Sequence, residues 1–138
     1  IIVLVTVASL AFASAASAAN FTSSQITTPA DGTFPTYNYE NPNTIHIDGT
    51  TAGGDSNADL VCFFGTSRKL LKPNVAAPGG VINADVPLAP LGNGAPRPYC
   101  ILRAIPAGDL TNSPPNAASA FAGPHIGEHM RTPLAHHG

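Results

Sequence analysis

Histidine and acidic residues near the end of the chain are the first candidates for chemistry. His125, Glu128, His129, His136 and His137 supply imidazole and carboxylate groups, which are ordinary ligands of zinc. The protease pattern His-Glu-x-x-His is absent. In the run HIGEH a glycine separates the first two histidines and a proline precedes them, which disfavours a helix that presents both on one face. We therefore predict no metal site and no cofactor, and expect these histidines to be incidental residues of a flexible tail.

A second candidate lies in the middle of the chain, where oxygen-bearing side chains alternate. Asp55, Asn57 and Asp59 follow the spacing of the first half of a calcium loop. The sixth position holds Leu60 instead of glycine and the twelfth holds Thr66 instead of glutamate. This excludes an EF-hand and leaves two interpretations, a turn between strands rich in Asp and Asn or a calcium site at the edge of a sandwich.

Aromatic residues offer a possible ligand surface. Phe34, Tyr37 and Tyr39 could stack against sugar rings, although tyrosines that flank a turn also serve to cover a core. The chain contains no tryptophan, which weakens a carbohydrate-binding prediction. A catalytic serine is not predicted either, because no Gly-x-Ser-x-Gly sequence is present.

Charge is sparse, with 8 acidic and 6 basic residues. Such a composition cannot build the strongly basic surface that nucleic acid or an anionic membrane requires. Arg68, Lys69 and Lys72 form the basic cluster. We expect it in a solvated hairpin turn after a strand that ends at Gly65, with docking to an acidic wall polymer as the alternative.

The first residues resemble an export signal. Residues 1–12 are apolar apart from Thr6 and Ser9, and residues 13–19 are all alanine or serine. Small side chains suit signal peptidase, and we predict a signal peptide over residues 1–18 with cleavage after Ala18. The alternative is a membrane anchor or the stem of a pilin-like subunit. Because residue 1 is not methionine, we expect the sequence to belong to a longer precursor.

Export gives the two cysteines a role. In an oxidising compartment Cys62 and Cys100 are predicted to form a disulfide, and the alternative is two free buried thiols. A Cys-x-x-Cys motif is absent, and two lone cysteines supply only half of a structural zinc shell.

We predict that these candidate residues are positioned by β-strands. Short apolar runs punctuated by 14 prolines and 13 glycines suit many strands joined by turns. Alternation places Ile45 and Ile47 on one face of a strand, with His46 and Asp48 on the other. The predicted strands cover residues 21–28, 44–50, 58–65, 81–88 and 99–105. The fourth, with Pro87 inside it, is expected at a sheet edge, and the third, apolar on both faces, is expected in a sheet centre. We predict an all-β sandwich over residues 20–108 and a disordered Pro/Ala/Gly-rich tail or linker over residues 109–138.

Four segments of the chain carry a family resemblance. The run Ile26-Thr27-Thr28-Pro29-Ala30-Asp31-Gly32-Thr33, the strands at 44–50 and 58–65, and the sequence YCILRAIPAG at 99–108 resemble bacterial immunoglobulin-like modules of exported surface proteins. The resemblance implies an immunoglobulin-like antiparallel β-sandwich that acts as a spacer, adhesive or ligand-presenting module. Two departures are the absent tryptophan and the position of Cys62 on the third expected strand instead of the second.

The sequence therefore predicts a non-catalytic structural or interaction module, secreted or on the extracellular cell surface. The alternatives are a domain that binds a polysaccharide or protein ligand, and the N-terminal accessory module of a secreted enzyme. Cell-wall polysaccharide or another surface protein are the expected partners. Nucleic acid is not expected, and a membrane is expected only through an uncleaved leader.

Overall fold

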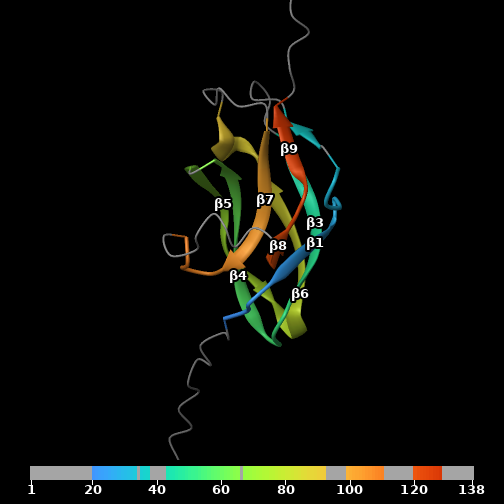
Figure 1. The fold of residues 1–138 in the computed structure, drawn as a ribbon, viewed down its shortest axis with the longest axis vertical. Helices are drawn as coiled ribbons and strands as arrows, with labels where there is room; N and C mark the ends of the chain where they lie inside the picture. The colour runs from blue at the N-terminus through green and yellow to red at the C-terminus, as the bar shows by residue number, and fades with distance from the viewer. Residues whose placement is uncertain are drawn as a thin grey trace, which may run out of the picture.

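A computed structural model describes residues 20–33, 35–37, 43–65, 67–92, 99–110 and 120–128 of the chain. These residues form two β-sheets packed face to face (Figure 1). One sheet has the strand order β6-β3-β1-β8 and the other β2-β9-β7-β4-β5. The elements are β1 (Ser24–Thr28), β2 (Thr36–Tyr37), β3 (Thr44–Thr51), β4 (Ser56–Phe64), β5 (Ser67–Ala77), the 3-10 turn η1 (Pro78–Gly80), β6 (Val81–Pro87), the 3-10 turn η2 (Ala89–Leu91), β7 (Tyr99–Pro106), β8 (Phe121–Ala122) and β9 (His125–Glu128).

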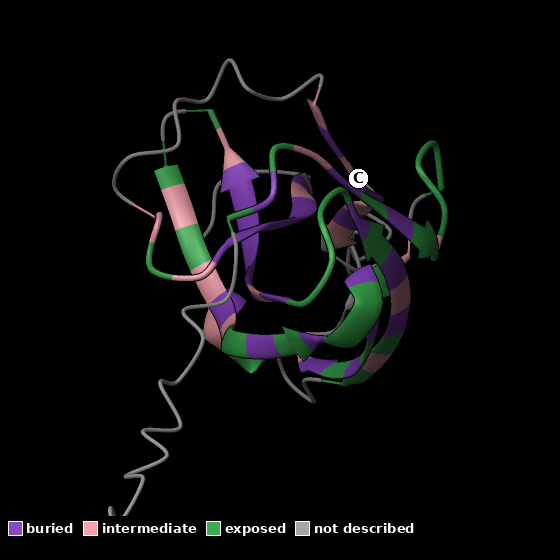
Figure 2. Cartoon of the chain, turned by 90° about the horizontal axis from the view of Figure 1, so that it is seen from below, coloured by how far each residue is buried: buried purple, intermediate pink, exposed green. Residues whose placement is uncertain are grey.

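The four-stranded sheet shows the expected alternation of buried and exposed side chains. In β3, Ile47 is fully buried while His46 is exposed. In β6, Ile82 and Val86 are fully buried while Asp85 points to solvent, and the stripes of Figure 2 follow this period along the strands. One face of this sheet thus faces the core and the other faces water, as in many antiparallel sheets. Among the described strands β6 pairs only with β3, which confirms its predicted edge position.

The five-stranded sheet is centred on β4, which lies between β5 and β7. Leu60, Val61 and Cys62 are fully buried and Phe63 nearly so, which confirms the prediction of a central strand that is apolar on both faces. The core also contains fully buried side chains from both sheets, namely Ile26, Ile47, Ile82, Val86, Leu102 and Ala104. The predicted all-β sandwich architecture is therefore confirmed.

The prediction of a disordered tail from residue 109 is wrong for residues 120–128. There β8 pairs in parallel with β1, and β9 pairs antiparallel with β7, so this segment adds a strand to each sheet. Phe121 packs edge-on against Phe21 with ring centroids 6.2 Å apart. The sandwich thus extends past residue 108 to residue 128, while residues 111–119 and 129–138 lie outside the described part.

Local sequence hides these two strands because the chain changes sheet after only two residues of β8. Gly123 and Pro124, both buried, make the crossing. The backbone carbonyl of Pro124 accepts a hydrogen bond from the amide of Leu102 at 2.9 Å. Each of these strands has one buried large apolar residue, Phe121 in β8 and Ile126 in β9. One such residue in each strand is too few to produce the alternating pattern by which a strand is recognised in a sequence.

The basic cluster was also predicted in the wrong element. Arg68, Lys69 and Lys72 lie in β5, because the turn after β4 is confined to the two positions between Phe64 and Ser67. Gly65 makes this tight turn possible with a φ of 58°, a conformation that glycine adopts without strain. Lysine on an edge strand such as β5 discourages pairing with another chain.

The described residues include no helix long and apolar enough to cross a membrane. The predicted signal peptide, residues 1–18, lies outside the described part.

Candidate functional site

Cys62 and Cys100 form the predicted disulfide. Their Cα atoms are 5.4 Å apart, and both residues are buried. Cys62 lies on β4, opposite Leu102 of β7, so the bond runs diagonally between neighbouring strands of one sheet. The disulfide therefore reinforces the β4–β7 pairing and does not connect the two sheets.

The predicted aromatic ligand surface lies almost entirely outside the described residues. This is the case for Phe34 and Tyr39. The backbone of Tyr37 belongs to β2, where it lies opposite Glu128 of β9. A ligand surface formed by these three residues remains a prediction.

The alternating Asp55, Asn57 and Asp59 bind the protein's own backbone and side chains. Asp55 Oδ1 accepts from the amide of Gly79 at 2.7 Å, and Asn57 Nδ2 donates to the side chain of Asn74 at 2.9 Å. The two carboxylate oxygens of buried Asp59 accept separate backbone amides, those of Asn74 at 2.8 Å and Gly108 at 2.9 Å.

These contacts give Asp59 a structural role. It holds an irregularity in the β4–β5 pairing, where Asn74 has a φ of 53°. Of the three residues predicted for an Asp/Asn-rich turn, only Asp55 lies outside the strands. Asn57 and Asp59 belong to β4.

His125 is not a residue of a flexible tail. It lies in β9, opposite Ile101 of β7. Glu128 ends the same strand, whereas His129, His136 and His137 are outside the described residues. Within the described ranges no group of three or more His, Cys, Asp or Glu side chains could hold a metal ion.

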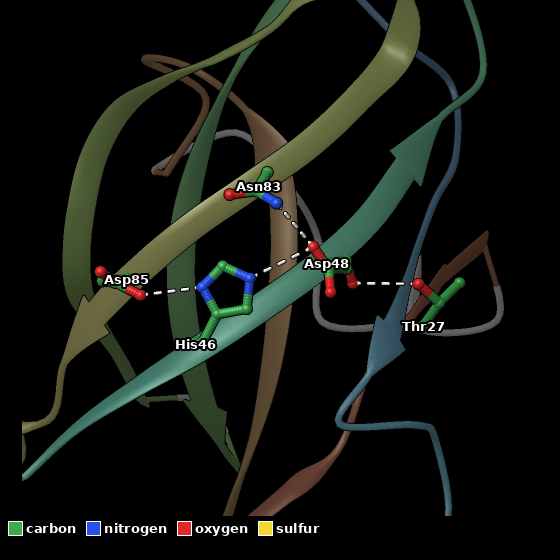
Figure 3. Close-up of polar contacts among 5 residues, drawn as sticks. All are labelled: Thr27, His46, Asp48, Asn83 and Asp85. Carbon is green, nitrogen blue, oxygen red and sulfur yellow. Dashed lines mark hydrogen bonds and ion pairs between the residues drawn. The ribbon is translucent and has the colours of Figure 1, made fainter.

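The structure reveals a polar cluster on the solvated face of the four-stranded sheet. The register of β3 and β6 places His46 opposite Asp85 and Asp48 opposite Asn83. We call these four residues the His46 cluster (Figure 3). His46 Nδ1 lies 2.8 Å from Asp85 Oδ1, and His46 Nε2 lies 3.3 Å from Asp48 Oδ1. Asn83 Nδ2 donates to the same Asp48 oxygen at 2.9 Å.

Both ring nitrogens of His46 thus face a carboxylate. The hydrogen bond to Asp85 is the largest influence and raises the pKa of His46 above its ordinary value of 6.5. Desolvation opposes this, and the hydrogen bond and charge of Asp48 add to the increase. All three side chains remain substantially exposed, at 48% for His46, 42% for Asp48 and 71% for Asp85.

This geometry differs from that of a hydrolytic triad. In a triad one ring nitrogen of histidine is held by a carboxylate and the other takes a proton from a hydroxyl nucleophile. Here the second nitrogen faces Asp48 instead of a hydroxyl group. The His46 cluster is therefore suited to holding two strands together by charge and not to activating a nucleophile.

Sequence reasoning placed His46 and Asp48 on one face but missed their partners. Asp85 lies 39 residues further along the chain than His46. Only the register of β3 against β6 brings them together, and no local pattern encodes that register.

A second polar arrangement surrounds Phe63 in the five-stranded sheet. The guanidinium groups of Arg68 and Arg103 lie 5.5 and 5.3 Å from the ring centroid, within the range of cation–π attraction. Arg68 also donates to the carbonyl of Leu110. Desolvation lowers the pKa of Arg103, with a smaller opposing effect of Asp31. The arginines thus cover an aromatic ring, so Arg68 is not simply a solvated turn residue.

An open groove lies beside the His46 cluster, between β5 and β6. Its lining includes Lys72, Asn74, Asn83 and Asp85. Lys72 Nζ donates to the backbone carbonyl of Asp85 at 2.9 Å, which links the edges of the two sheets.

Comparison with protein-family models, with curated proteins and with solved structures finds no match to this chain.

Proposed function

We propose that this chain is an immunoglobulin-like module of a secreted or cell-surface protein, with a structural or interaction role and no catalytic activity. The observation that carries the proposal is a two-sheet sandwich whose buried cysteines are joined by a disulfide. Stable disulfides form in oxidising compartments outside the cytosol. The signal peptide predicted for residues 1–18 points the same way.

The strand order supports the immunoglobulin-like assignment. In immunoglobulin domains strands A, B and E share one sheet and strands C, F and G the other, and variable-type domains add strand C′ beside C. If β1, β3, β4, β5, β6, β7 and β9 are equated with A, B, C, C′, E, F and G, the two sheets read E-B-A and G-F-C-C′. This equivalence accounts for every strand of the described part except the two-residue strands β2 and β8.

Two features depart from antibody domains. Their disulfide joins strands B and F across the sheets, with a tryptophan packed against it. Here the bridge joins the equivalents of C and F within one sheet, and the chain has no tryptophan. The resemblance is therefore one of architecture, and an antibody-type core is not part of the proposal.

The roles of the polar residues support a non-catalytic module. Asp55 and Asp59 bind backbone amides, and both nitrogens of His46 face carboxylates. Nucleophilic catalysis needs a nucleophile and a base within reach of each other. In the described part these side chains instead hold strands and turns in place.

Ligand binding is the second candidate, favoured by the groove between β5 and β6. Its ammonium, amide and carboxylate groups could hydrogen-bond to the hydroxyl groups of a polysaccharide or to a protein surface. The described residues that line it include no aromatic ring for stacking against a sugar. The interaction module without a dedicated small-ligand site thus remains the preferred proposal.

The test is fractionation of the source cells under conditions that block thiol exchange, followed by mass spectrometry of the native protein. The proposal predicts recovery from the medium or the cell surface, with an N-terminus near Asn20 and no thiol that reacts with an alkylating agent. Recovery from the cytosol with the leader intact and both thiols reactive would overturn it.

A further inference from the structure

The edge strand β6 is attached to its sheet on one side only. Among the described strands it pairs with β3 alone, through a register that runs from Thr44 opposite Pro87 to Thr50 opposite Val81. Edge ladders next to solvent open more easily than central ones. Interactions between β3 and β6 side chains therefore add to the core packing of Ile82 and Val86 in holding β6 in place.

The His46 cluster lies within this ladder and links the two strands. His46 and Asp48 come from β3, whereas Asn83 and Asp85 come from β6 (Figure 3). The 2.8 Å contact between His46 and Asp85 and the 2.9 Å bond from Asn83 to Asp48 both cross from one strand to the other.

The contacts of His46 depend on its protonation state. An imidazolium ring has two N–H donors and can donate to both carboxylates at once. A neutral ring has one N–H, so its other nitrogen presents a lone pair to a carboxylate oxygen. Deprotonation thus removes one hydrogen bond and the charge attraction, and it leaves a repulsive contact.

We propose that the His46 cluster is a pH-dependent clasp that holds edge strand β6 on β3 more firmly in mildly acidic than in alkaline solution. Within the described part of the chain, the charged groups that face His46 are Asp48 on its own strand and Asp85 on β6. From β5, Lys72 reaches the backbone of Asp85. From β1 the uncharged Thr27 contributes a hydroxyl that donates to the carbonyl of Asp48 at 3.2 Å.

The sign of the effect follows from the hydrogen bonds. Because the two carboxylates favour the charged ring, the pKa of His46 is higher in the folded protein than its ordinary value of 6.5. The stabilisation is fully present below that ordinary value and is lost as the pH rises through the folded-state pKa. Loosening of β6 is therefore expected on the alkaline side.

The test is NMR on the full oxidised chain, and its first part follows the ring of His46 through a pH titration. We expect a titration midpoint above 6.5 in the wild type. The midpoint should fall in Asp85→Asn and fall by less in Asp48→Asn. A wild-type midpoint at or below the ordinary value, or one unmoved by Asp85→Asn, would overturn the proposal.

The second part measures amide hydrogen exchange at about pH 5.5 and about pH 8, on either side of ordinary histidine titration, with correction for intrinsic rates. Amides of the β3–β6 ladder should lose protection at the higher pH in the wild type but not in His46→Gln. Amides of the β4–β7 ladder serve as the internal control and should respond equally in both proteins. Equal pH responses of the β3–β6 amides in wild type and His46→Gln would contradict the clasp, and the wild-type titration keeps the test valid if a variant does not fold.

Discussion

Removal of the Cys62–Cys100 disulfide should destabilise the domain chiefly through the unfolded state. The two cysteines are separated by 38 positions, and a loop of this length predicts about 4 kcal/mol of stabilisation in the chain-entropy model. The folded state should change little, because the β4–β7 register on either side of the bridge holds the strands in place. For a domain of about 110 residues this loss corresponds to a fall in Tm of about 15–20 °C.

The assay is urea denaturation of three samples. These are the oxidised wild type, the reduced wild type with its thiols left unmodified, and the double variant Cys62→Ala/Cys100→Ala. The reduced protein should lose stability and show a larger m-value, because an uncrosslinked unfolded chain exposes more surface. The double variant should lose somewhat more, since each alanine also removes a buried sulfur atom. A loss of less than about 1 kcal/mol on reduction would contradict this role of the disulfide, because such a loss lies below the range expected for a native disulfide in a small domain.

Three further tests use chemical denaturation, and two of them include a control variant. Gly123→Ala would place a methyl group against the backbone carbonyl of Leu102 and should cost at least about 1–3 kcal/mol; an unchanged midpoint would mean that the crossing between β8 and β9 does not pack on β7. Asp59→Ala removes the acceptor of two backbone amides and should cost about 1–3 kcal/mol for each amide left without a partner, with partial recovery in Asp59→Asn; equal stability of the alanine variant would refute this role. Leu102→Ala, at a fully buried position, should cost about 2–5 kcal/mol, whereas Val81→Ala, 55% exposed, should stay within about 0.5 kcal/mol; similar effects at both positions would contradict the assigned core.

The strands with a strong local pattern could be predicted from sequence. Alternation located β3, and a continuous apolar run located β4 and its central position. The disulfide could be predicted once export was assumed, because two cysteines allow only one intramolecular bridge. These predictions succeeded because each depends on residues that are adjacent in the chain or on the number of cysteines.

Features that depend on distant pairing could not be predicted. The strands β8 and β9 are too short to show a period, and they are stabilised by contacts with β1 and β7. The match of His46 with Asp85 depends on strand register. The sequence predicts Arg68 in a solvated turn because it follows the strand expected to end at Gly65, whereas its guanidinium group packs over Phe63.

Nuclear Overhauser effects between backbone protons of the oxidised chain test the central claim, that residues 120–128 complete a two-sheet sandwich. If they do, cross-strand contacts are expected between Cys100 and Ile126 and between Ser24 and Phe121, with slowly exchanging amides in β9. Random-coil chemical shifts and rapid exchange throughout residues 120–128 would contradict it.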